Sequence, residues 1–134
     1  MTKCYKKERD EDFLAACERI RNQNRGQYLS CTEIAIRAAA APAGSFYLDE
    51  RTIFHIISRM RSNSLRPPRQ AHIRQLYTDI WARYVFIKTV HNRQYVPLTT
   101  IAIAGIIETQ PAPRFYFSRA HAKELYYRCL RNKI

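Results

Sequence analysis

Basic side chains and hydroxyls recur at helical spacing in two stretches of the chain, 50–63 and 118–132. In the first stretch, Arg51, His55 and Arg59 fall four residues apart, so they share one helix face opposite an isoleucine-rich face. Arginine can donate two hydrogen bonds to the O6 and N7 atoms of guanine, and basic side chains or hydroxyls can contact phosphate. The chemistry that this spacing predicts is non-covalent contact with nucleic acid.

The candidate DNA-contacting residues lie on the polar faces of these two stretches. They also include the arginines that follow the stretch 50–63 and one arginine before the stretch 118–132. They are Arg51, His55, Ser58, Arg59, Arg61, Arg66, Arg69, Arg114, Arg119, His121, Lys123, Arg128 and Arg131. Arg114 is expected to be exposed and unpaired, and Glu124 would repel a phosphate. An ordinary solvated surface is the alternative explanation for each stretch, because runs of charge commonly face solvent.

No pattern in the chain predicts catalysis. The four histidines lie in separate segments, without a carboxylate or nucleophile at a useful spacing, and the three glycines form no phosphate-binding loop. The four cysteines include no C-x-x-C pair and no histidine at zinc-ligand spacing, so we expect reduced core or surface thiols. We therefore predict a protein that is not an enzyme and has no metal, cofactor or small-molecule substrate.

The excess positive charge is confined to the later part of the chain. The net charge is +12, from 23 basic and 11 acidic residues, yet residues 1–50 carry eight of each. Residues 51–134 carry the remaining fifteen basic residues and only three acidic ones, Asp79, Glu108 and Glu124. Nucleic acid is the commonest partner of such a basic domain, with DNA favoured here over RNA because no RNA-binding motif is present.

The apolar pattern predicts a cytoplasmic protein without a membrane partner. No apolar run approaches the roughly 18 residues of a membrane span. The first residues are polar and charged, without the apolar core of a signal peptide.

Helical periodicity divides the chain into successive segments. Residues 1–9 are expected to form a flexible lead-in. The acidic run Asp10, Glu11 and Asp12 suits the start of a first helix, which runs to a stop at Gly26. Ser30 and Glu33 form a capping box for a second helix from about residue 31, which Pro42 ends. The further predictions are a helix at 50–63 capped by Asp49, a Pro/Arg linker at 64–69, a long helix at 70–91 and a last helix after Ser118.

An internal repeat connects the two halves of this pattern. The stretch Pro-Ala, two variable residues and Phe-Tyr occurs at 42–47 and again 69 positions later, at 111–116. The apolar positions of the preceding helices match at offsets of 67 and 69. These aromatic pairs can be interpreted as base-stacking groups or as packing corners before a helix cap, and we favour the corners. The corner residues are Pro42, Phe46, Tyr47, Pro111, Phe115 and Tyr116.

The repeat predicts an all-α protein, built as a tandem repeat of two three-helix units that share one core. The first unit spans 10–63 and the second 70–134. Each is too small to bury much surface alone. The β-branched residues of segment 99–108 favour a strand when they are considered alone, but the position of the segment in the repeat predicts a helix.

In element order and length, each unit resembles the helix-turn-helix superfamily, although about seven residues, Pro42 to Leu48, replace its short turn. The chain is also similar to small basic proteins carried on bacterial mobile elements. The resemblance implies double-stranded DNA binding through the third helix of each unit, in transcription regulation or mobile-element maintenance.

The sequence alone also allows a second class of function. A helical protein-interaction module could use the same basic face to bind an acidic protein partner. Monomer and homodimer are both open, because an internal repeat can supply the two-fold symmetry that dimers supply elsewhere.

Overall fold

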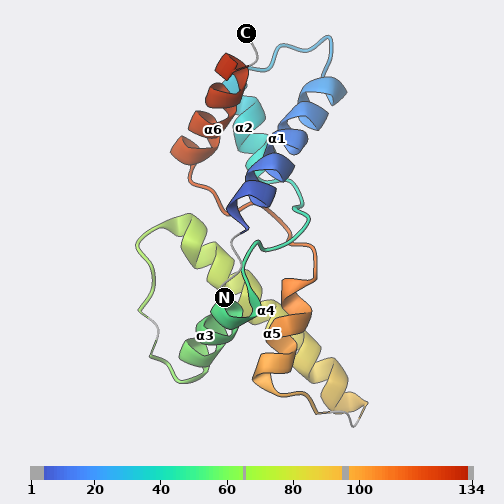
Figure 1. The fold of residues 1–134 in the computed structure, drawn as a ribbon, viewed down its shortest axis with the longest axis vertical. Helices are drawn as coiled ribbons and strands as arrows, with labels where there is room; N and C mark the ends of the chain where they lie inside the picture. Colours follow the sequence, from blue (N-terminus) through green and yellow to red (C-terminus); the bar gives the residue numbers. More distant parts are fainter. Residues whose placement is uncertain (1–4, 65, 95–96, 133–134) are drawn as a thin grey trace.

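The computed structural model describes residues 5–64, 66–94 and 97–132, and this part of the chain is all-α (Figure 1). The helices are α1 (Lys6–Gln23), α2 (Cys31–Ala39), α3 (Glu50–Arg61), α4 (Ala71–Arg93), α5 (Thr100–Glu108) and α6 (Arg119–Asn132). The helical prediction for 99–108 is confirmed by α5. No helix among the described residues is both long and apolar enough to cross a membrane.

Side-chain caps set the starts of four helices. Ser30, Asp49, Thr99 and Ser118 each accept a hydrogen bond from the backbone N–H three residues further on, at 3.0–3.2 Å. Such caps satisfy N–H groups that have no partner inside the helix. After α1, Gly26 adopts the left-handed conformation with φ +90°, as expected for a helix stop.

The first helix starts earlier than the sequence predicted. It begins at Lys6, so the flexible lead-in expected at 1–9 is wrong for residues 6–9, while residues 1–4 lie outside the described residues. The acidic run was expected to cap the helix start. Instead Asp12 lies inside the helix and accepts hydrogen bonds from the Gly44 N–H, at 2.9 Å, and from the Tyr47 hydroxyl.

The six helices pack in two lobes (Figure 1). In the terminal lobe, α1, α2 and α6 pack on one another, and this lobe contains both ends of the described chain. In the central lobe, α3 packs most extensively against α5, and α4 packs against both. All the helix–helix packing lies within a lobe, and the segments 40–49 and 109–118 cross between the lobes.

This packing differs from the consecutive grouping that the repeat suggested. Helix α3 lies against α4 and α5 instead of against α1 and α2, and α6 lies against α1 and α2. The linker 64–69 therefore joins two helices of the same lobe. The physical reason is that each corner is extended and carries the following helix away from the one before it.

The two crossing segments pair with each other where they meet. Ala43 and Ala112 exchange both backbone hydrogen bonds, at 2.9 and 3.0 Å, as a single antiparallel bridge. On either side of it, the ring of Phe46 stacks on Tyr116 and that of Tyr47 on Phe115. Phe46 and Phe115 are buried, as packing residues are, and are not available to stack on bases.

The tyrosine hydroxyls of the corners bond to carboxylates. Tyr47 donates to Asp12 and Tyr116 donates to Asp79. Each bond ties a crossing segment to a long helix, α1 or α4. The corners therefore fix the positions of the helices that follow them, α3 and α6.

Candidate nucleic-acid interface

The candidate DNA-contacting residues are distributed over both lobes. Ser58 is half-buried, and the other twelve are exposed. Five lie on α3, two in the linker, one on the second crossing segment and five on α6. Figure 1 shows α3 and α6 on the same side of the long axis of the molecule, one in each lobe.

The exposed face of α3 carries the stripe Arg51, His55 and Arg59, because its isoleucines are buried on the opposite side. Acidic side chains gather at the start of this helix. Asp49, Glu50 and the distant Glu108 line the same open hollow as Arg51 and His55. The start of α3 is thus mixed in charge, and the basic excess on this helix lies toward its C-terminal end.

The close approach of α5 creates this mixture. A Cβ atom added to Gly105 would lie 3.3 Å from the Glu50 carboxylate, which is tight contact. Because Gly105 lacks a side chain, α5 can pack closely on α3 and bring Glu108 to its N-terminal end. Local sequence could not reveal this acid, since Glu108 is 58 positions from Glu50 in the chain.

Two basic residues, one on α3 and one on α4, make contacts inside the central lobe. The guanidinium of Arg61 donates to the Thr100 hydroxyl, at 2.7 Å, and links α3 to the start of α5. Arg74 on α4 donates to the carbonyl oxygens of Pro68 and Arg69, at 2.9 and 2.7 Å. Arg74 thus holds the linker against α4, with the Arg69 side chain exposed.

On α6, the acid that was expected to repel phosphate is paired. Arg128 donates to Glu124 at 2.7 Å, and both side chains are exposed. The ammonium group of Lys123 lies 5.8 Å from the centre of the Tyr127 ring. Because the pair is exposed and lies four residues apart on one helix, its attraction is weak and Arg128 can exchange partners.

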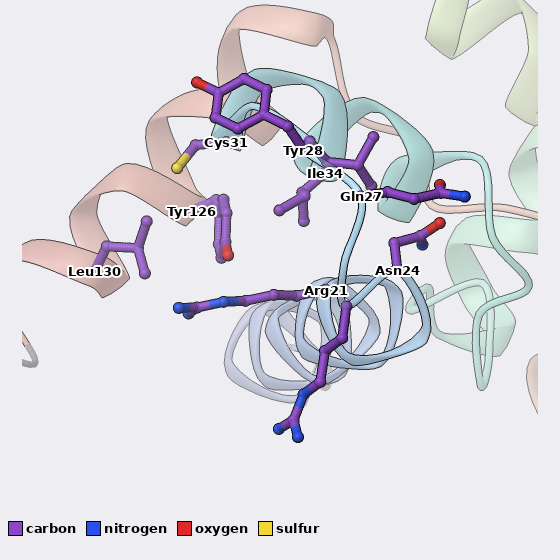
Figure 2. A pocket seen from close by; sticks show the side chains of 10 residues that line it. Arg21, Asn24, Gln27, Tyr28, Cys31, Ile34, Tyr126 and Leu130 are labelled. Atoms are coloured by element: carbon purple, nitrogen blue, oxygen red, sulfur yellow. The ribbon is translucent and has the colours of Figure 1, made fainter.

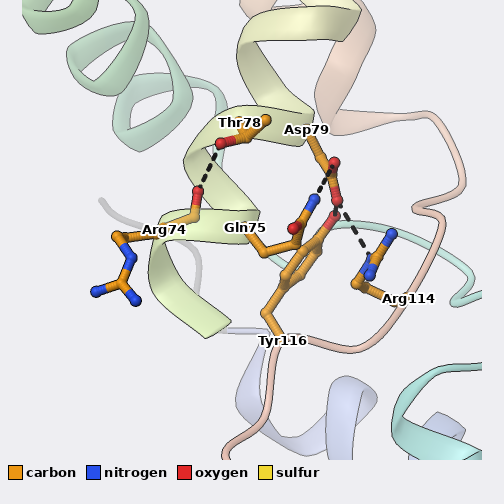
Figure 3. A network of polar contacts seen from close by, with 6 residues as sticks. All are labelled: Arg74, Gln75, Thr78, Asp79, Arg114 and Tyr116. Carbon is orange, nitrogen blue, oxygen red and sulfur yellow. Dashed lines mark hydrogen bonds and ion pairs between the residues drawn. The ribbon is translucent and has the colours of Figure 1, made fainter. Parts of the chain in front are cut away.

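Arg114 is not the unpaired residue that the sequence predicted. Its Nε atom lies 3.4 Å from a carboxylate oxygen of Asp79 (Figure 3). The same carboxylate accepts hydrogen bonds from the Tyr116 hydroxyl at 2.6 Å and from the Gln75 amide at 2.8 Å. Burial, followed by the bond to Asp79, raises the pKa of Tyr116 above its ordinary value, so the phenol stays protonated as the donor.

A further basic cavity of about 360 Å³ lies between the end of α1, the start of α2 and α6 (Figure 2). Arg21 and Arg25 line it beside Tyr28 and Tyr126. Neither arginine is in the candidate set that the sequence predicted. Their neighbours come from three separate helices and loops, so no local signal could have identified the cavity.

No group of three or more histidine, cysteine or acidic side chains that could hold a metal ion occurs within the described ranges. Comparisons with protein-family models, curated proteins and solved structures find nothing that matches this chain. Interpretation of the surface therefore depends on its own geometry and charge.

Proposed function

We propose that this chain binds double-stranded DNA through the basic side chains of α3, α6 and the linker 66–69. The observation that carries the proposal is that the excess of positive charge after residue 50 is displayed to solvent. Twelve of the thirteen candidate side chains are exposed, and they occur in both lobes. Basic side chains that reach phosphates release counterions from the duplex, which favours binding without base-specific contacts.

The placement of α3 and α6 supports a mode of binding. Both helices lie on one side of the elongated molecule (Figure 1), so a duplex along that side would meet the two in succession. In this proposal, two helix-turn-helix-like groups of three helices contact the DNA. One consists of α1 and α2 with α6, and the other of α4 and α5 with α3.

We further propose that the two halves are copies of one three-helix unit. Equivalent contacts support this: Asp12 with Tyr47 corresponds to Asp79 with Tyr116, at offsets of 67 and 69. Ala43 and Ala112, also 69 apart, bond reciprocally to each other. An internal two-fold axis of this kind suits a DNA target with two inverted half-sites, and hence a regulatory or mobile-element role.

Titration of a labelled DNA duplex at 50 and 200 mM salt tests the proposal. With about six phosphate contacts, affinity should fall about a thousand-fold between these salt concentrations. Single-stranded DNA and duplex RNA serve as comparison ligands, and duplex DNA should bind most tightly. Absence of binding to duplex DNA at 50 mM salt would contradict the proposal.

Paired substitutions identify the helix that makes contact. Arg51→Ala with Arg59→Ala, or Arg119→Ala with Lys123→Ala, should each weaken binding and lower the salt slope by about 0.9 per lost phosphate contact. The matched control is Arg19→Ala with Arg37→Ala, which removes two exposed arginines of α1 and α2 outside the candidate set. An equal loss in the control would show that only total charge matters.

One observation favours the alternative function, a protein-interaction module with a basic face for an acidic partner. Phe86 on α4 is 67% exposed and its neighbour Val85 is 44% exposed. Exposed aromatic side chains are frequent anchors in protein interfaces. If duplex DNA fails to bind at low salt, an acidic protein becomes the favoured partner, and Phe86→Ala should then weaken that complex.

A further inference from the structure

A cleft lies at the junction of the two lobes and has a cavity volume of about 300 Å³. Its walls come from the end of α2, the first turns of α4 and α6, and the second crossing segment. The apolar part of the lining includes Ile36, Ala39, Phe115, Phe117 and Ala122. Phe115, Phe117 and Ala122 belong to the core and Ala39 packs against it, so the cleft has a fixed floor.

The polar part of the lining is basic. Arg114 and Arg119 border the cleft together with His72 and Gln75, and no acidic side chain lines it among the described residues. Asp79 is the acid nearest to Arg114, at 3.4 Å. The Asp79 side chain is only 17% exposed and its carboxylate already accepts bonds from Tyr116 and Gln75, so little of its charge faces the cleft.

Two effects lower the pKa of His72, and burial is the larger of them. Burial lowers the pKa of His72, and the charge of His121 on α6 lowers it further. A positive potential at this point disfavours a second positive charge and favours a bound anion. Among the described residues, neither histidine side chain makes a hydrogen bond or ion pair, and the His121 ring lies 4.7 Å from the Phe117 ring.

An apolar floor with a few convergent polar groups is the usual composition of a small-molecule site, and 300 Å³ is at the lower end of the usual volumes. We propose that the junction cleft binds a small organic anion, in which a phosphate or carboxylate contacts Arg114 and Arg119 and a planar apolar body lies on the floor. The ligand is about the size of a single substituted ring. The inference does not depend on DNA binding, although both arginines also belong to the proposed DNA-contacting set.

The test uses the full chain without nucleic acid and follows the histidine ring signals by NMR. The probes are phenyl phosphate and benzoate, which distinguish the two anionic groups. Two controls each lack one feature of the ligand: inorganic phosphate has no ring, and benzyl alcohol has no anionic group. Phenyl phosphate, benzoate or both should shift the His72 signals, with a dissociation constant on the order of 1 mM for so small a ligand. The exposed His55 on α3 should not shift and serves as the internal reference.

Two variants separate the cleft from general charge attraction. Arg119→Gln should weaken binding of the shifting probe about ten-fold, whereas Arg37→Gln, an exposed arginine that does not line the cleft, should leave it unchanged. Ala40→Leu fills the cleft from an exposed lining position and should abolish binding with no change in charge. Thermal unfolding checks that each variant is folded.

The proposal is overturned if neither ringed anion shifts His72, or if inorganic phosphate binds as tightly as phenyl phosphate. It is also overturned if Arg119→Gln and Arg37→Gln have equal effects. The anion-binding test and the DNA titration are independent, since either can fail while the other succeeds.

Discussion

At the scale of single residues, two carboxylates connect the crossing segments to the long helices. Asp12 on α1 accepts from the Gly44 N–H and the Tyr47 hydroxyl, and Asp79 on α4 accepts from Tyr116 and Gln75 and forms an ion pair with Arg114. Hydrogen bonds to a charged group are among the stronger ones, and a partly buried donor left without its acceptor is costly. We therefore expect these bonds to affect stability measurably.

Tyr116→Phe removes one hydroxyl and leaves the ring packing of the corner in place. The free energy of unfolding should fall by about 1–2 kcal/mol, because the bond to a carboxylate is lost. Tyr127→Phe on the exposed face of α6 is the matched control and should change it by less than about 0.5 kcal/mol. Urea unfolding measures both values, and equal values would contradict a specific role for the Asp79 bond.

Cys17 should be the least reactive of the described cysteines. Burial raises the pKa of its thiol to about 12, whereas Cys31 and Cys129 are partly exposed. Thiolate is the reactive form, so at pH 8 iodoacetamide should modify Cys31 and Cys129 well before Cys17 in the folded protein. Mass spectrometry of the alkylated peptides measures the order.

The same shift has a consequence for stability. The thiol ionises in the unfolded chain near its ordinary pKa of 9.0 but stays protonated in the folded protein until about pH 12. Its contribution is therefore fully present below pH 9 and is lost as the pH rises toward 12. Modification of native Cys17 as fast as Cys31 would contradict both statements.

At the scale of elements, local sequence chemistry determines where the helices begin. The start of α3 is the clearest case, since the Asp49 side chain accepts from the Thr52 N–H at 3.0 Å. Hydrogen bonding by the Thr52 side chain, followed by this backbone bond, holds the pKa of Asp49 below its ordinary value. A lowered pKa means that the carboxylate stabilises the folded state above its unfolded pKa of 3.8, and that this stability is lost as the pH falls through the folded value.

Asp49→Ala should lower the free energy of unfolding by about 1 kcal/mol at pH 7, because the cap is lost. The difference from the parent chain should begin to shrink below about pH 4, where the unfolded carboxylate starts to be protonated, and should vanish below the lowered pKa of the folded state. Asp49→Asn is the control, because asparagine caps as well as aspartate but does not titrate. Unfolding curves at pH 7 and pH 3.5 measure this, and a pH-independent difference for Asp49→Ala would contradict it.

At the scale of the whole molecule, each half of the chain contributes to both lobes. Residues before the linker supply α1 and α2 to the terminal lobe and α3 to the central lobe, and residues after it supply α4 and α5 to the central lobe and α6 to the terminal lobe. The core is one continuous cluster of buried side chains from both lobes. The linker 64–69 is therefore not needed to hold the halves together.

Fragments 1–66 and 67–134, produced together, should associate and elute as one complex in size-exclusion chromatography. Ile57→Asp in the first fragment places a charge on the buried face of α3 and should abolish the complex. His55→Asp, on the exposed face of the same helix, should leave it intact. Separate elution of the two unmodified fragments would show that α3 and α6 do not pack as the structure has them.

The sequence by itself determined the helices of this protein. Periodicity, the Ser30 and Asp49 caps and the Gly26 stop act within a few residues, and so their effects can be read locally. The start of α1 was missed because Asp12, which looked like a cap, has its partners in a distant crossing segment. Helical periodicity alone also predicted that most of the candidate basic residues are exposed.

Only the tertiary structure decided which helices form each lobe. The apolar faces of α3 and α6 are alike enough that sequence allows either consecutive or exchanged packing. The extended corners, joined at Ala43 and Ala112, carry each of these helices away from the one before it. Long-range packing likewise brought Glu108 into one hollow with Arg51 and closed the junction cleft, because Ile36, His72 and Arg119 on its walls are far apart in the chain.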